Sequence, residues 1–138
     1  MQERREFFRI DVDVPVFIRV PAGGEAGDCA CTLGKEKFSD DIKKSLVRRI
    51  NISGAGISFL SDKQYSAGDL IEMLVMIENV YPGIITLCTR VLRSEKRRNK
   101  YFTAVEYIGM TTEIRELISA FVFQLQRTLI QEKRVGWL

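Results

Sequence analysis

The sequence of 138 residues predicts one mainly β domain, an antiparallel barrel or sandwich that is followed by a long C-terminal helix. Three observations point to this fold class. Apolar side chains alternate at a period of two over about six successive segments, and no helical pattern lies between most of them. Short segments rich in glycine, proline and charge separate these strands. Beyond Gly109 the apolar spacing changes to three and four residues, which is typical of an amphipathic helix.

The first predicted strand runs from Asp11 to Val20, where valine or isoleucine occupies every second position and is expected to face the core. Pro15 interrupts this strand. Because proline has no N–H to donate, we expect an edge or a bulge there. The segment from Pro21 to Ser45 contains four glycines and few large apolar residues, which predicts a long loop. We expect a short helix from Ser39 to Leu46.

The remaining strands are predicted at residues 46–52, 55–60, 69–78, 84–94 and 101–108. The helix is predicted from Glu113 to about Lys133, with Thr112 able to cap its first turn. Its length of roughly 30 Å exceeds what a small barrel needs as a lid. One interpretation is therefore that part of the helix contacts a partner. The other is that the whole helix packs on its own barrel, and we give the two equal weight.

We expect a single domain over residues 1–138. Residues 1–11 would form an N-terminal arginine switch segment, residues 12–110 the barrel with its long loop at 21–45, and residues 111–134 the C-terminal helix.

Composition excludes several functions. The chain has no histidine, which removes Ser-His-Asp and Cys-His catalysis and the usual nitrogen ligand of zinc, so no metal site is expected. The three cysteines lack the spacing of a disulfide framework, and we expect free thiols in a reducing compartment. No uncharged apolar run is long enough to span a membrane, and the first residues are unlike a secretory leader. The expected location is therefore the cytoplasm, without membrane insertion.

Two arginines near the start, Arg5 and Arg9, are candidates for binding an anion. Their spacing of four residues turns both side chains the same way in an extended segment or in a helix. Guanidinium groups bind phosphate with two hydrogen bonds, stack on flat rings and donate to the O6 and N7 edge of guanine. The same spacing separates Arg93 and Arg97, so the pair alone is a weak signal.

A second candidate element is the turn Asn51-Ile52-Ser53-Gly54-Ala55-Gly56. An amide and a hydroxyl at a strand end can bond the polar edge of a base. Glycines allow the backbone to turn tightly. Asparagine, serine and glycine are also the residues of ordinary turns, so this element gains meaning only together with the arginines.

Together these two elements resemble a known family. Arg5-Glu6-Phe7-Phe8-Arg9 resembles the Arg-x-x-x-Arg motif, and the segment 51–56 the Asp/Asn-x-Ser-x-x-Gly motif, of the PilZ family. The resemblance spans nearly the whole chain. It implies a six-stranded antiparallel β-barrel, often with a C-terminal helix, and binding of the bacterial second messenger cyclic di-GMP. The residues that it implies for the ligand are Arg5 and Arg9 for phosphates and guanine faces, Asn51 and Ser53 for a guanine, Gly56 to keep the turn open, and Arg4 as an adjoining candidate.

The implied mechanism is a switch. Ligand would fold the charged N-terminal segment against the barrel, with Phe7 and Phe8 as apolar anchors, and the closed state would present a new surface to a protein partner. The segment 21–45 is longer than the short hairpin connection that the family leads us to expect. This longer segment leaves both motifs intact, so it bears on how the domain signals to a partner more than on how it binds the ligand.

Two other functions remain open. A small nucleic-acid-binding barrel is suggested by a basic hairpin with adjoining aromatic residues, namely Arg90, Arg93, Lys96, Arg97, Arg98, Lys100, Tyr101 and Phe102. A domain without ligand could act as an adaptor or in oligomerisation through the long helix and Trp137. Catalysis is not expected, because Asp40 and Asp41 adjoin two lysines in a polar segment and read as solvated carboxylates.

Overall fold

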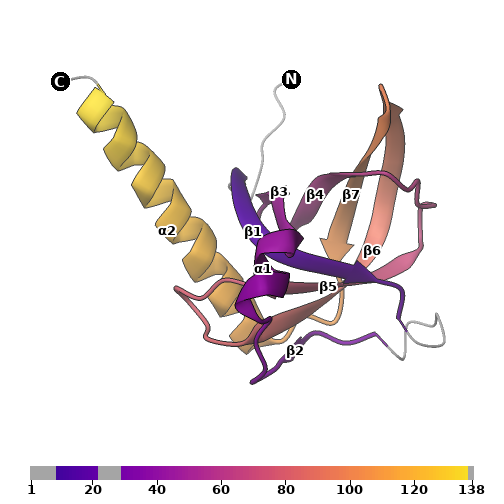
Figure 1. The fold of residues 1–138 in the computed structure, drawn as a ribbon, viewed down its shortest axis with the longest axis horizontal. Coiled ribbons are helices and arrows are strands. Elements are labelled where there is room, and N and C mark those ends of the chain that lie inside the picture. The colour runs from indigo at the N-terminus through magenta and orange to yellow at the C-terminus, as the bar shows by residue number, and fades with distance from the viewer. Residues whose placement is uncertain (1–8, 22–28, 137–138) are drawn as a thin grey trace.

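The computed structural model of the protein describes the backbone of residues 9–21 and 29–136, and the side chains as far as residue 129. Six antiparallel strands form a closed barrel, and a long helix runs outward from it (Figure 1). Around the barrel the strands follow the order β1 (Ile10–Arg19), β3 (Val47–Ile52), β4 (Gly56–Ser61), β7 (Lys100–Tyr107), β6 (Ile84–Arg97) and β5 (Leu70–Met76). The predicted barrel with a C-terminal helix is therefore confirmed.

Strand β1 passes from one neighbour to another along its length. Its residues as far as Pro15 pair with β3, and those from Val16 onward pair with β5. Pro15 therefore lies at the changeover between two partners and not in an edge strand. A residue without an N–H is tolerated at this point because the hydrogen-bonded ladder changes partner there.

The barrel interior holds the apolar faces that the alternation predicts. Val14, Ile50, Phe59 and Val105 are all buried, and they belong to one continuous cluster. Val20 is the exception to the predicted inward face, since 60% of its surface is exposed. Strand β1 ends at Arg19, so the alternation of that strand no longer determines where the next side chain points.

The described part of the long loop contains two elements. The short helix is present as α1 (Asp40–Leu46), and the hydroxyl of Ser39 accepts a hydrogen bond from the N–H of Ile42 at its start. The sequence did not predict β2 (Thr32–Leu33), which pairs with β6 beside the barrel. Two residues are too few to show an alternating pattern, so only the tertiary pairing reveals this strand.

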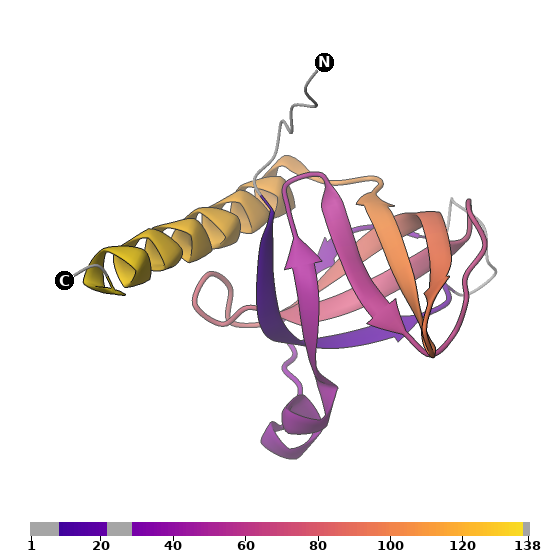
Figure 2. The ribbon, with the colours of Figure 1, turned by 90° about the horizontal axis from the view of Figure 1, so that it is seen from above.

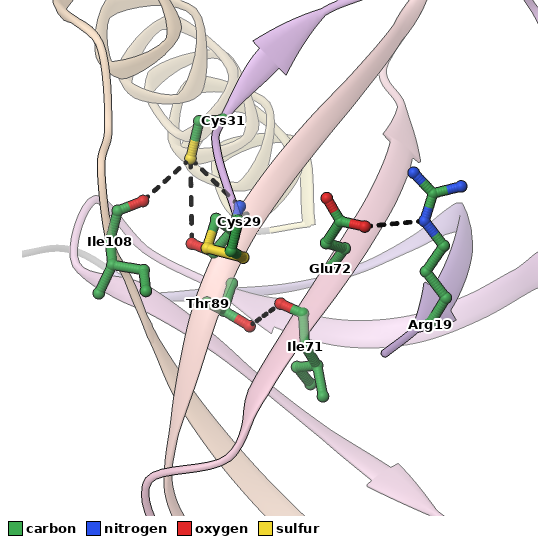
Figure 3. The surroundings of a disulfide bond; sticks show 8 residues. Arg19, Cys29, Cys31, Ile71, Glu72, Thr89 and Ile108 are labelled. Carbon is green, nitrogen blue, oxygen red and sulfur yellow. Dashed lines mark hydrogen bonds and ion pairs between the residues drawn. A yellow bond between two sulfur atoms is a disulfide. The ribbon is translucent and has the colours of Figure 1, made fainter. Parts of the chain in front are cut away.

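The prediction of three free thiols is wrong for two of the cysteines. Cys29 and Cys88 form a disulfide that ties the segment before β2 to β6 (Figure 3). Cys31 keeps a free thiol, and its Sγ lies 3.3 Å from the carbonyl oxygen of Ile108 and 3.2 Å from the N–H of Cys88. Burial raises the pKa of the Cys31 thiol. Sequence spacing could not identify the pair, because its partners are 59 residues apart and only the barrel brings them together.

Helix α2 (Thr112–Gly136) is longer than predicted, at about 38 Å for its 25 residues. Its cap is Thr111, one residue before the expected Thr112: the Thr111 hydroxyl accepts from the N–H of Ile114 at 3.2 Å. The first turns bury Ile114 and Ile118 in the barrel core. The rest of the helix extends beyond the barrel (Figure 2). Trp137 lies outside the described residues.

Candidate functional site

The turn between β3 and β4 is held by the hydroxyl of Ser53. Its Oγ accepts hydrogen bonds from the N–H of Ala55 at 3.1 Å and of Gly56 at 3.2 Å, and the Ser53 N–H donates to the Gly56 carbonyl at 3.0 Å. Serine forms such local turns because its short side chain reaches the backbone two or three residues ahead. Only 4% of the surface of Ser53 is exposed. The structural role of this buried hydroxyl is therefore to hold the shape of the turn.

Gly56 is required by the close approach of a neighbouring strand. A Cβ at this position would lie 2.0 Å from the carbonyl oxygen of Val105 and 3.2 Å from the Cα of Glu106, both on β7. Backbone atoms cannot move aside as a flexible side chain does, so only glycine fits without a shift of strand β7. The physical reason for this glycine is thus the packing of β4 on β7, in addition to the turn itself.

Sequence reasoning missed Tyr107, which supports the turn from beneath. Its hydroxyl donates to the carbonyl oxygen of Ser53 at 2.9 Å and lies 3.4 Å from that of Gly56. Burial raises the pKa of the phenol. The signal was present in the sequence, since Tyr107 continues the inward alternation of Thr103 and Val105, and a buried tyrosine hydroxyl needs a partner.

Small side chains form a shallow floor on the outer face of the barrel beside this turn. The register places Asn51 opposite Ser58, Ser58 opposite Ala104, and Gly56 opposite Glu106. Over this floor lies a cavity of about 210 Å³. Its lining consists of Arg9, Asn51, Ser53, Ala55, Gly56, Ile57, Ser58, Leu92, Ala104, Val105 and Glu106.

The structure thus brings four of the six predicted site residues to one cavity: Arg9, Asn51, Ser53 and Gly56. Arg9 is exposed, and the amide of Asn51 donates to Asp11 at 3.0 Å. Arg4 and Arg5 lie outside the described residues.

The far wall of the cavity comes from strands that sequence reasoning did not connect to the turn. Leu92 lies at a register irregularity between Val91 and Arg93, and 53% of its surface is exposed. Such bulges redirect a side chain, and they occur often beside binding sites. Glu106 follows on β7. Strand register would have identified both residues, but register depends on tertiary pairing that the sequence pattern alone does not supply.

A second groove, of about 410 Å³, continues along the same outer face and shares Asn51 and Ser58 with the first. Its cations already have partners. The guanidinium of Arg97 lies 4.2 Å from the centre of the Phe102 ring, and Arg49 binds Asp13 through two hydrogen bonds of 2.7 and 3.2 Å. The hydrogen bond from Arg49 lowers the pKa of Asp13. These contacts satisfy the arginines internally.

Within the described residues, no group of three or more acidic or cysteine side chains is placed to hold a metal ion. No helix there is long and apolar enough to cross a membrane. The arrangement of the site is that of a binding surface: a polar turn, a floor of small residues, one exposed arginine and one carboxylate.

A family model for the PilZ domain matches residues 3–124, which include both the turn and the arginine-containing segment. The chain belongs to the PilZ domain family. Among solved structures it is similar to a tetrameric PilZ domain from Xanthomonas campestris, described as self-assembled through a helical bundle. The two chains share 14% sequence identity over 91% of each, with a TM-score of 0.64, so this likeness shows the fold. No curated protein matches the chain in sequence.

Proposed function

We propose that this PilZ domain is a cyclic di-GMP receptor that changes conformation when the ligand binds and signals to a protein partner. One observation carries the proposal: the Asn51–Gly56 turn and Arg9 line the same cavity, although 42 residues separate Arg9 from Asn51. PilZ domains generally bind this messenger and are in general not catalytic. In this proposal Asn51 and the rim of the turn bond a guanine, and Arg9 contacts phosphate or the face of a base.

The cavity also supports a role for the N-terminal segment. At about 210 Å³ it is smaller than the roughly 300 to 1,000 Å³ of pockets that enclose a small molecule. A dinucleotide on this floor would therefore need a further wall. We propose that Arg4, Arg5 and the two phenylalanines after them supply it, and that closure of this segment over the ligand is the conformational signal.

Helix α2 is the proposed output element. Its apolar stripe passes from fully buried Ile118 and Phe121 to half-buried Leu125 and then to Leu129, which is 40% exposed. The stripe therefore continues past the barrel that covers its first half. An apolar stripe without cover favours contact with another helix, either in a partner protein or in a second copy of this chain. Assembly through a helical bundle is known for the Xanthomonas neighbour.

A domain that oligomerises without ligand is thus the second candidate function. Analytical ultracentrifugation of the wild type and of Leu129→Ser distinguishes it. Oligomers that form without nucleotide and dissociate in the variant would favour this function. If the protein is a monomer at all concentrations, the apolar stripe of α2 is not a surface for self-association.

Binding of nucleic acid is not part of the proposal. Arg93 and Arg97 stack on Phe102 and pair with Glu95, Arg90 pairs with Glu106, and Lys100 pairs with Asp62. Most of the hairpin cations therefore have partners already, which lowers the attraction for an arbitrary strand.

A cytoplasmic location is proposed because a receptor must meet its messenger there. The Cys29–Cys88 disulfide bears on this, since disulfides persist mainly in oxidising compartments. Quantitative thiol labelling of protein taken rapidly from cells is the direct check. Three reactive thiols after denaturation would agree with a reduced cytoplasmic protein, and one would place it in an oxidising compartment.

The proposal is tested by calorimetric titration of the full chain with cyclic di-GMP, alongside GTP and a linear guanine dinucleotide. Saturable binding at micromolar or lower concentration of the cyclic ligand, with much weaker binding of the other two, is expected. No heat and no thermal shift at millimolar ligand would overturn the receptor function and leave the oligomerisation candidate.

A further inference from the structure

Glu106 occupies an unusual place for an acidic residue, because it borders a cavity proposed for an anion. It lies on the outward face of β7, directly opposite Gly56 on one side and Arg90 on the other. Since Gly56 has no side chain, nothing at that position covers Glu106 toward the cavity. A carboxylate here would repel phosphate, so a favourable role must come from a part of the ligand that donates hydrogen bonds.

Arg90 holds the carboxylate of Glu106 in place and uses only part of its capacity to accept hydrogen bonds. The Nε of Arg90 donates to Oε2 of Glu106 at 3.1 Å, and the side chain of Glu106 remains 39% exposed. A carboxylate offers about four lone-pair positions on two oxygens. One guanidinium contact therefore orients the group from the β6 side and leaves acceptor positions for a ligand on the β4 side.

The surroundings suit a flat ring whose edge meets Glu106. Gly56, Ser58 and Ala104 give a low floor, and the exposed side chain of Leu92 stands beside it as an apolar surface for a ring face. Arg9 and Asn51 contribute donors to the same cavity. The carboxylate of Glu106 contributes acceptors only. The cavity is thus supplied with both kinds of hydrogen-bonding group.

Guanine and adenine differ in what they offer to such an acceptor. Guanine carries two adjacent donors, N1–H and the N2 amino group, at the spacing of the two oxygens of a carboxylate. Adenine offers a single donor at the same edge, its N6 amino group, beside an unprotonated N1 acceptor that a carboxylate repels. A site built around a charged acceptor therefore disfavours adenine, because only one carboxylate oxygen can be paired and the other is left desolvated against N1.

We infer that Glu106, oriented by Arg90, is the specificity-determining residue of this cavity, where its carboxylate accepts hydrogen bonds from the Watson–Crick edge of one guanine and excludes adenine. The inference rests on the proposed function and adds to it the basis of selection between guanine and adenine dinucleotides. Arg90 is a positioning residue in this account.

Glu106→Gln is the test, because it keeps the size of the side chain and replaces one acceptor by an amide donor. Wild type, Glu106→Gln and the control Glu95→Gln are titrated by calorimetry with cyclic di-GMP and cyclic di-AMP. Glu95 lies in β6 outside the cavity lining and also pairs with arginine. Thermal melting of each variant checks folding, which is expected to persist because exposed ion pairs contribute little.

The wild type and Glu95→Gln are expected to prefer cyclic di-GMP by about 30-fold or more. Glu106→Gln is expected to lose about 10- to 100-fold in affinity for cyclic di-GMP, as for removal of a charged acceptor, while its affinity for cyclic di-AMP stays equal or rises. Unchanged preference in a folded Glu106→Gln variant overturns the inference and leaves the receptor function standing. No binding of either dinucleotide to the wild type overturns both.

Discussion

Two regions of this barrel carry arginines on the same outer face, and their surroundings differ. In the β6–β7 hairpin, Arg93 and Arg97 face the Phe102 ring and the carboxylate of Glu95. Beside the β3–β4 turn, Arg9 is exposed at the rim of a cavity whose floor is made of small side chains.

The comparison shows that the number of charges is a poor guide to a binding site. The hairpin has more cations, but aromatic and acidic neighbours within the protein already satisfy them. The turn has one described arginine, together with space that no side chain of the described residues fills. An exposed arginine beside an open floor of small side chains, and not charge alone, distinguishes the candidate site.

The largest expected effect separates the two arginine pairs directly. Arg5→Ala/Arg9→Ala should weaken binding of cyclic di-GMP by at least about 100-fold, because each hydrogen bond to a charged group contributes about 1.5 to 3 kcal/mol. Arg93→Ala/Arg97→Ala, at identical spacing, should change it by less than about threefold. Calorimetry with all three proteins measures both. If Arg93→Ala/Arg97→Ala instead loses more affinity than Arg5→Ala/Arg9→Ala, the ligand binds at the hairpin.

The next effect tests whether ligand binding at the turn depends on the disulfide. Reduction of the Cys29–Cys88 disulfide should lower the free energy of unfolding by about 2 to 4 kcal/mol, because the bond closes a long loop of the unfolded chain. Ligand affinity should stay within a few-fold. Urea unfolding with and without dithiothreitol measures the first effect, and Cys29→Ala should no longer respond to the reductant. Equal midpoints of the wild type in both conditions would contradict a stabilising disulfide.

Two substitutions that exchange glycine and a residue with a Cβ should act oppositely in the two regions. Gly56→Ala places a methyl group against the β7 backbone and should cost about 1 to 3 kcal/mol of stability. Arg98→Gly, in the hairpin, removes a Cβ from a residue with a φ of 59° and should leave stability unchanged or raise it by up to about 1 kcal/mol. Denaturant unfolding of both variants provides the comparison, and full stability of Gly56→Ala would rule out the described packing of β4 on β7.

Hydroxyl deletion gives a smaller contrast. Tyr107→Phe removes the hydrogen bond to the Ser53 carbonyl and should cost about 1 kcal/mol. Tyr101, in the hairpin, makes no hydroxyl hydrogen bond to another described residue, so Tyr101→Phe should be nearly neutral. If thermal melting ranks the two variants equally, Tyr107 does not support the turn.

The smallest effect is a pH dependence of stability that comes from the ion pair between Lys100 of the hairpin and Asp62. The hydrogen bond from Lys100 lowers the pKa of Asp62 below its usual 3.8. A lowered carboxyl pKa stabilises the fold above the unfolded-state value, and this contribution disappears as the pH falls through the folded-state value. Asp62→Asn should therefore melt slightly below the wild type at pH 6, and the gap should shrink progressively as the pH falls below about 4. A gap that stays constant from pH 6 down to the lowest pH at which both proteins remain folded would exclude this ion pair as its cause.

Much of the barrel follows from local patterns. The alternation of Val12, Val14 and Val16 and the changed period after Gly109 suffice for strands and helix, because burial of one face is a local property of the chain. The turn that holds Asn51 and Ser53 also follows from a local pattern, its asparagine, serine and glycine residues. The disulfide, strand β2 and the Leu92–Glu106 wall were missed, since each depends on which strands pair and in what register. Tyr107 was missed although its inward position follows from alternation, because its hydrogen-bond partner Ser53 is fixed only by the tertiary fold.

The central claim is that the cavity beside the turn, and not the basic hairpin, receives the ligand. Amide chemical shifts of the ¹⁵N-labelled full chain during titration with cyclic di-GMP test it most directly. The account predicts saturable shifts at Arg9, Asn51, Gly56, Ser58 and Glu106, with only minor changes from Lys96 to Lys100. Shifts confined to the hairpin, with the turn unaffected, would contradict it.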